Sequence, residues 1–209
     1  MSSLRARQKE DRRNRIASSA KGLFRQKGYH KTTIENIAEE AGVSGVTVHN
    51  YYGTKAGVLL ALVIESDQRL IQKLDNTLAD HRGGVVELTV SFARQIMDHA
   101  IVNLEKDIWR QVIAAVTIEA DTQLSRAYAK LDEQLAFALV RRLEAMQLDA
   151  HIAASVNPLH LGRALFQLQN ARFVEFIASD DMTQEEAEVR LRNDLAALFS
   201  VHETRSEAH

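Results

Sequence analysis

The chain of 209 residues has no cysteine, only one proline and only nine glycines. Without cysteine it can form neither disulfides nor thiolate metal sites, which is compatible with a reducing compartment. The shortage of proline and glycine leaves few residues that break helices. Ala, Leu, Glu, Arg and Gln are abundant and favour helix, so we expect an all-α fold.

Long apolar stretches are also missing. Neither a charged leader followed by an apolar segment nor an apolar run of about eighteen residues is visible, which argues against secretion and membrane spanning. Hydrophobic residues make up 45% and charged residues 26% of the chain, as in folded soluble proteins. We expect a cytoplasmic protein with no membrane partner.

The net charge of −2 hides an uneven distribution along the chain. Residues 1–55 carry eleven Lys or Arg against five acidic residues, a net charge of +6, so the remaining residues carry −8. A basic segment joined to an acidic one is expected when only one end of the molecule meets a polyanion. Taken alone, this distribution favours a solvated charged N-terminus, and its coincidence with the helix-turn-helix pattern of residues 32–55 reverses that preference.

Residues 32–55 have the pattern of two short helices joined by a tight turn. Thr32 and Glu35 have the spacing of a capping box, which predicts a helix from about residue 33. Gly42 suits the left-handed position that ends it, and Ser44 can cap a second helix over residues 45–52. This arrangement predicts a helix-turn-helix.

Several short motifs in the N-terminal part of the chain resemble those of a known family. They are Arg15-Ile16-Ala17, Leu23-Phe24-Arg25-Gln26-Lys27-Gly28-Tyr29, Thr32-Thr33-Ile34, Ile37-Ala38, Ala41-Gly42-Val43-Ser44, Thr47, Tyr51-Tyr52 and Lys55-Ala56-Gly57-Val58-Leu59. In these residues the chain resembles the N-terminal domain of the TetR family of bacterial transcriptional regulators. The resemblance covers about residues 10–70. The rest matches only in length and helical character.

The resemblance implies that the helix over residues 45–52 enters the major groove of DNA. Phosphate contacts would come from Thr33, Thr47, Tyr51 and Lys55, and base contacts from Gly45, Val46, His49 and Asn50. The family usually has lysine and glycine where this chain has Gly45 and Val46, tyrosine at His49, and a large residue at Asn50. The DNA sequence preference of the family therefore cannot be transferred.

We expect three parts along the chain: a flexible basic arm over residues 1–9, a three-helix helix-turn-helix domain over residues 10–55, and a larger helical effector-binding and dimerisation domain over residues 56–209. Apolar periodicity predicts about nine helices in all. The first should span residues 11–27. The last two should span about 158–178, opened by Asn157-Pro158, and 183–201, opened by Thr183 and Glu186.

By resemblance, a small-molecule effector binds the larger domain and two copies of the chain pair through its last two helices. Candidate pocket residues are Phe92, Trp109, Tyr128, Phe166 and Asn170, and candidate dimer residues are Leu161, Leu165, Leu168, Leu191, Leu195 and Leu198. Each pocket candidate could instead be ordinary core, and the second face of these two helices could instead cover the chain's own core.

We expect a homodimeric repressor that a small-molecule effector releases from a palindromic operator. An activator and an effector-independent regulator are the alternatives within the family. An all-α interaction module or enzyme is a third reading. The sequence contains no paired metal-ligand motif and no phosphate-binding loop, so we expect no catalytic residues, no metal and no cofactor.

Overall fold

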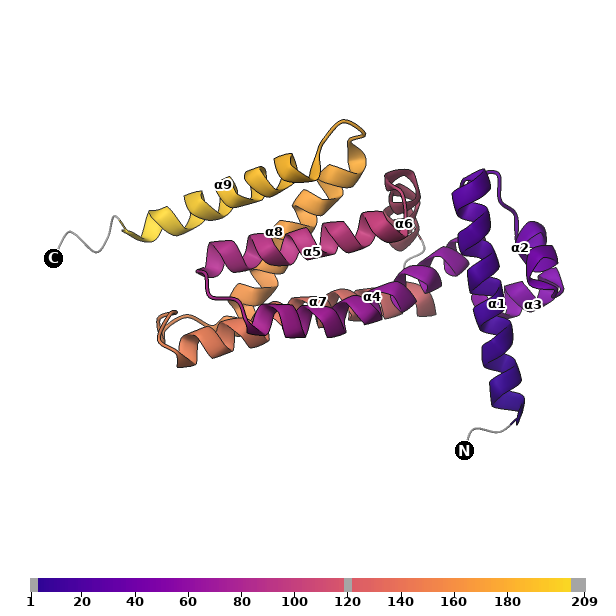
Figure 1. The fold of residues 1–209 in the computed structure, drawn as a ribbon, viewed down its shortest axis with the longest axis horizontal. Coiled ribbons are helices and arrows are strands. Elements are labelled where there is room, and N and C mark those ends of the chain that lie inside the picture. The colour runs from indigo at the N-terminus through magenta and orange to yellow at the C-terminus, as the bar shows by residue number, and fades with distance from the viewer. Residues whose placement is uncertain (1–3, 119–121, 204–209) are drawn as a thin grey trace. The chain divides into compact units, whose positions relative to one another are not determined.

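The computed structural model describes residues 4–118 and 122–203, and this part of the chain folds into nine α-helices and no strands. In order they are α1 (Leu4–Lys27), α2 (Ile34–Ala41), α3 (Gly45–Tyr52), α4 (Lys55–Ala79), α5 (Val85–Asn103), α6 (Lys106–Ile118), α7 (Gln123–Leu148), α8 (Pro158–Ala178) and α9 (Gln184–Glu203) (Figure 1). The all-α prediction and the helix number are confirmed. None of the described helices is long and apolar enough to cross a membrane.

The chain divides into two compact units. Unit 1 contains the residues up to Asp67 together with Leu104–Ala129, and unit 2 contains Gln68–Asn103 together with the residues from Lys130 onward. This division differs from the expected boundary after residue 55. The difference arises because α4 contributes to both units and because α6 returns to unit 1.

The core of unit 1 is built where α1, α2 and α3 pack together. Ile16, Ala20 and Phe24 of α1 are almost fully buried, as are Ile37 of α2 and Val48 of α3. In α1 the buried positions recur at helical spacing, so a single face of the helix covers the two shorter helices.

The N-terminal part of α1 differs from the prediction. Residues 4–9 were expected to belong to a flexible arm, whereas the structure continues α1 as regular helix back to Leu4. Residues 1–3 lie outside the described residues. The basic residues of this segment therefore lie on a helix rather than on a flexible arm.

The start of α2 is also shifted by one residue from the prediction. The hydroxyl of Thr32 points inward and donates to the carbonyl of Gly28 at 2.9 Å, which closes the end of α1. Thr33 is therefore the N-cap, and it forms a capping box with Asn36 instead of Thr32 with Glu35. The predicted capping device exists, with different residues.

Unit 2 is built around the packing of α5, α8 and α9, with α8 lying across α5 (Figure 1). Its core is rich in aromatic and aliphatic side chains. Those of Phe92, Leu88 and Met97 on α5 are fully buried, as are those of Leu191 and Leu195 on α9. The predicted start signals of both last helices are present: Asn157 caps α8 ahead of Pro158, and Thr183 and Glu186 form the reciprocal bonds that open α9.

Candidate nucleic-acid interface

The turn between α2 and α3 has the geometry that the sequence predicts. Gly42 adopts φ 63° and ψ 42°, a left-handed conformation that glycine reaches without strain. The amide of the next residue, Val43, donates to the carbonyl of Ala38 at 2.9 Å. Ser44 then caps α3 by accepting a hydrogen bond from the amide of Thr47 at 3.2 Å. The two helices are thereby fixed as a helix-turn-helix.

The short helix α3 has one buried face and one open face. Val48 is fully buried and Tyr52 is 6% exposed, so these two side chains anchor the helix to unit 1. Val46, His49 and Asn50 are exposed, and Val46 is 70% exposed although its side chain is apolar. The exposed residues follow the helical repeat, so they lie on the side that a ligand in front of α3 would meet.

One of the four predicted phosphate contacts, Thr33, also caps a helix, and a second, Thr47, bonds the cap residue Ser44. The Thr33 hydroxyl accepts from the amide of Asn36, and the Thr47 hydroxyl lies 2.8 Å from the hydroxyl of Ser44. Thr33 is exposed and Thr47 is half-buried, at the starts of α2 and α3. Helix starts offer free amides and a partial positive charge to an anion.

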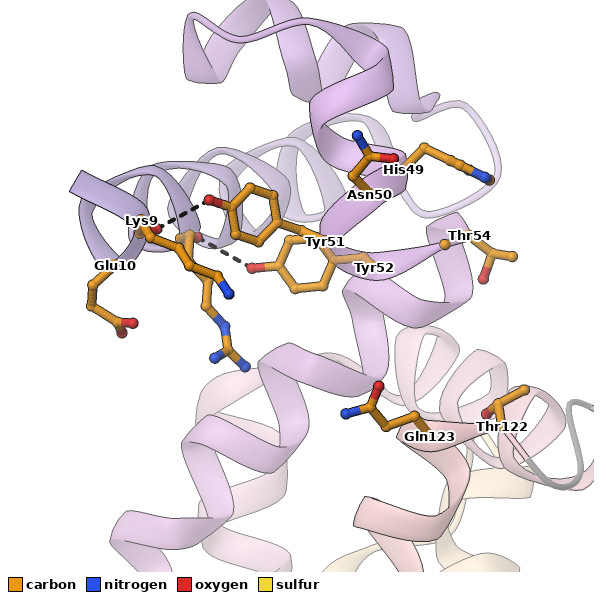
Figure 2. A pocket seen from close by; sticks show the side chains of 11 residues that line it. Lys9, Glu10, His49, Asn50, Tyr51, Tyr52, Thr54, Thr122 and Gln123 are labelled. Atoms are coloured by element: carbon orange, nitrogen blue, oxygen red, sulfur yellow. Dashed lines mark hydrogen bonds between the residues drawn. The ribbon is translucent and has the colours of Figure 1, made fainter. Parts of the chain in front are cut away.

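The tyrosine pair at the end of α3 ties it to α1. The Tyr51 hydroxyl donates to the carbonyl of Lys9 at 3.4 Å, and the Tyr52 hydroxyl donates to the carbonyl of Arg13 at 3.3 Å (Figure 2). Burial raises the pKa of the Tyr52 phenol, an effect that the neighbouring Arg13 guanidinium opposes. Tyr51, expected at a phosphate, is thus directed toward α1 in this structure.

Lys55 has a role that the sequence reading did not anticipate. Its ammonium donates to the carbonyls of Tyr29 and Thr32, both at 2.8 Å, and lies 4.2 Å from the centre of the Tyr29 ring. Burial lowers the pKa of this ammonium. In this structure the Lys55 ammonium is therefore engaged by the protein itself, and its contact with DNA phosphate stays a prediction. Lys55 stabilises the turn between α1 and α2, because that turn supplies two carbonyls near the start of α4.

A recess of about 750 Å³ lies within unit 1, against the open side of α3. Figure 2 shows Lys9 and Glu10 of α1 near the tyrosine pair, with His49 and Asn50 above them. The lining residues are Lys9, Glu10, Arg13, His49, Asn50, Tyr51, Tyr52, Gly53, Thr54, Thr122 and Gln123. Sequence reasoning missed the part of Lys9 and Arg13 in this surface, although the basic excess of residues 1–55 pointed to it.

The predicted pocket residues come from both compact units. Phe92 and Phe166 are buried in unit 2 and pack edge to face with ring centres 6.3 Å apart. Asn170 is a half-buried residue of the same unit. Trp109 and Tyr128 belong to unit 1, where Trp109 is 4% exposed. The five residues are therefore divided between the two units.

Three of the six predicted dimer residues are covered by the chain's own core, and the other three stay candidates. Leu165, Leu191 and Leu195 are 3%, 0% and 0% exposed, so the chain's own core already covers them and they cannot touch a partner. Leu161 and Leu168 are half-buried, and Leu198 is 58% exposed. Leucine periodicity therefore marked the inner face of α8 and α9 at only three of the six positions.

Comparison with known proteins agrees with this geometry. Residues 16–62 match the family described as "Bacterial regulatory proteins, tetR family". The HTH-type transcriptional regulator HbdR of Aromatoleum sp. (strain CIB) is 46% identical over 50 residues, 24% of this chain and 22% of that protein. The fatty acid metabolism regulator protein of Bacillus subtilis (strain 168) is 26% identical over 74 residues, 35% of this chain and 38% of that protein. The sequence matches thus span well under half of either curated relative.

Solved structures match over nearly the whole chain. A TetR-family regulator from Pectobacterium atrosepticum has a TM-score of 0.68 at 16% identity, over 91% of this chain and 93% of that one. FadR of Thermus thermophilus, a TetR-family repressor solved with lauroyl-CoA, has a TM-score of 0.65 at 26% identity, over 86% of this chain and 92% of that one. The match at 16% identity shows the fold alone. Residues 16–62 therefore carry the N-terminal domain of the TetR family of bacterial transcriptional regulators, and the described chain has the fold of that family's solved members.

Proposed function

We propose that the protein is a homodimeric repressor that binds a palindromic operator through α3 and is released by a small-molecule effector. The observation that carries the proposal is the open face of α3, where Val46, His49 and Asn50 are exposed while Val48 and Tyr52 hold the helix in the core. Because its target would be chromosomal DNA, we place the protein in the cytoplasm.

Base reading is assigned to the exposed side chains of α3. The Asn50 amide can bond both N6 and N7 of adenine, and the exposed methyl groups of Val46 suit a thymine methyl. Thr33 and Thr47, at the starts of α2 and α3, would hold phosphates and fix the register without reading sequence. Gly45 adds no side chain, so the backbone of α3 can approach the bases closely there.

The dimer would form through the outer face of α8 and α9. Four exposed residues of α8, Ala164, Ala171, Val174 and Ala178, recur at spacings of seven, three and four, which places them on one stripe. Val189 of α9 is 51% exposed. A stripe of small side chains lets two helices approach closely, and a two-fold axis would bring each stripe against its copy.

The effector would bind inside unit 2. Gln169 on α8 is 1% exposed, and its carbonyl oxygen has no hydrogen-bond partner among the described residues. It lies one turn from Phe166, which packs on Phe92. A buried amide without a partner is costly, so an apolar effector carrying an N–H or O–H donor would gain by bonding to it. Lauroyl-CoA is a suitable first probe, because the Thermus relative was solved with it.

Selection of binding sites from random duplex DNA tests the DNA-binding proposal. We expect an enriched palindrome whose half-sites are separated by about 34–36 Å, one helical turn, or a small multiple of it. Asn50→Ala should relax the base preference at one position of each half-site. Asn76→Ala, the same change at an exposed residue of α4, should leave the preference intact. Absence of any enriched sequence would remove the proposed function.

Two further measurements test whether the protein represses transcription and whether an effector releases it from DNA. A reporter transcribed from the selected operator distinguishes repression from activation. Titration of the protein–operator complex with lauroyl-CoA should release the DNA if acyl thioesters are effectors, and Gln169→Leu should weaken that release without changing operator affinity. Release requires the effector to prefer the conformation that binds DNA poorly, because the coupling between the two sites is reciprocal.

A further inference from the structure

The first three turns of α1 are unusual for a helix in a folded unit, because all twelve residues from Leu4 to Arg15 are exposed. They include six Lys or Arg and two acidic residues, a net charge of +4. No apolar face of this segment is covered by the rest of the described chain. Its helical form therefore cannot be explained by burial of apolar surface.

The charges of this segment oppose its own helix. Arg5 and Lys9, and again Lys9 and Arg13, are like-charged pairs four residues apart, which destabilise an isolated helix. The first turn of α1 contains no acidic residue, so its cations also face the positive end of the helix dipole. Glu10 and Asp11 offset only part of this repulsion. An external anion along the helix would remove it.

The helical repeat of α1 shows on which face of the helix these cations lie. Ile16, Ala20 and Leu23 form the stripe that α1 buries in unit 1. Counting back along the same stripe at helical spacing gives Arg12, Lys9 and Arg5. The face that is apolar over the core thus becomes basic where it extends beyond the core, on the side where the other helices of unit 1 lie.

This basic face adjoins the surface that is proposed to read DNA. Lys9 and Arg13 line the same recess as His49 and Asn50 (Figure 2). Long hydrogen bonds from Tyr51 and Tyr52 to the carbonyls of Lys9 and Arg13 hold α1 against the end of α3. A nucleic-acid strand that met Asn50 would therefore pass close to Lys9.

We infer that residues 4–15 of α1 form a second DNA-contacting surface, which lies on the phosphate backbone beside the half-site read by α3. Arg5, Lys9 and Arg12 bind phosphates, and the two tyrosines position the segment. The inference rests on the proposed function. It adds a contact that extends the footprint of each half-site and strengthens binding without changing base preference, because phosphate contacts carry no sequence information.

The test compares two triple variants of the full-length protein. Arg5→Gln/Lys9→Gln/Arg12→Gln, called the extension variant, removes three charges from residues 4–15 of α1. Glutamine keeps helix propensity high. The matched control, Arg25→Gln/Lys27→Gln/Lys31→Gln, removes three exposed charges from the other end of α1 and the turn after it. Affinity is measured by fluorescence anisotropy over a range of salt concentrations, on the duplex recovered by selection and on a mixed-sequence duplex of equal length.

The extension variant should bind the selected duplex at least tenfold more weakly at moderate salt. Its plot of log affinity against log salt should be shallower by about 2 to 3, since each lost phosphate contact lowers the slope by roughly 0.9. The control should change the slope by less than about one such contact. Hydroxyl-radical footprints of the extension variant should lose backbone protection at the edges of each half-site.

Equal slope changes in the two triple variants, or none in either, would overturn the inference and leave the proposed function standing. A wild-type protein that selects no sequence would instead remove the proposed function itself. Far-ultraviolet circular dichroism confirms that each variant keeps its helical content before binding is compared.

Discussion

At the scale of single residues, Gly45 is a departure from the family in α3, the helix that is proposed to read DNA. It opens α3 directly after the Ser44 cap, and a Cβ built on it would meet no atom within 4 Å. The glycine is therefore not required by packing. A side chain placed there would project from the start of α3, where the family usually has a lysine.

Gly45→Lys should tighten binding to every duplex rather than to one sequence. One added phosphate contact should steepen the plot of log affinity against log salt by about 0.9 and raise the affinity severalfold at low salt. Gly45→Ala is the control, because it adds the Cβ without the charge. An equal gain in affinity for both variants would mean that helix propensity, rather than charge, causes the effect.

Lys55 is a second residue whose role the structure changes. Its ammonium bonds two carbonyls of the turn between α1 and α2, so Lys55→Met should leave both acceptors without their charged donor. We expect the free energy of unfolding to fall by about 1–3 kcal/mol, measured by urea denaturation without DNA. Lys55→Gln keeps an N–H donor and should lose less. Unchanged stability of both variants would show that these two bonds do not stabilise the fold.

At the scale of elements, α5 and α9 are held together in unit 2 by an ion pair of unequal exposure. The Arg94 side chain is 59% exposed and that of Glu188 is 11% exposed, and the guanidinium contacts both carboxylate oxygens. Burial raises the pKa of Glu188, but hydrogen bonds from Arg94 and Gln184 outweigh it and leave the pKa lowered. The charged carboxylate is therefore favoured in the folded state.

This lowered pKa predicts how stability depends on pH. A carboxyl whose pKa is lower in the folded state stabilises the fold above its unfolded pKa, about 4.5, and this contribution is lost as the pH falls through the folded value. Urea denaturation between pH 3 and pH 7 should show a steeper acid loss for the wild type than for Glu188→Gln. Parallel curves would show that the pair contributes nothing. Glu175, whose pKa the Arg172 guanidinium lowers, contributes with the same sign in both proteins.

The elements themselves were largely predictable from sequence, because helix starts and stops are local. Pro158 behind Asn157, and Thr183 with Glu186, gave the starts of α8 and α9 without knowledge of the rest of the fold. The packing between helices was not predictable. Gly162 of α8 approaches Val140 of α7 so closely that a Cβ there would lie 2.6 Å from the valine side chain, and no local pattern indicates such a contact.

Site residues were predictable from sequence only where they belong to a local motif. The exposure of His49 and Asn50 follows from the helix-turn-helix pattern, because Val48 and Tyr52 fix which side of α3 is buried. The role of Lys55 depends on carbonyls more than twenty residues earlier in the chain, so sequence spacing could not reveal it. Whether a side chain is available for a ligand depends on its burial and its partners. These are set by elements far away in the sequence, so local patterns do not show them.

At the scale of the whole molecule, DNA reading and dimer formation are assigned to opposite ends of the sequence. The charge distribution fits this arrangement, since residues 1–55 carry +6 and the remainder −8. The acidic remainder would be repelled by DNA, so electrostatics favours approach with residues 1–55 toward the duplex. Two half-sites can be bound together only if two chains pair.

Ala171→Glu places a charge in the exposed small-residue stripe of α8 without touching α3. Sedimentation should show a shift from dimer to monomer, because two copies would bring like charges together at the axis. Affinity for a palindromic duplex should fall at least tenfold, while affinity for a duplex with one half-site stays unchanged. Ala129→Glu, at an exposed position of α7, is the matched control. If Ala171→Glu remains dimeric and binds the palindrome normally, the partner surface lies elsewhere, and the coupling of two reading helices must be sought through a different face of unit 2.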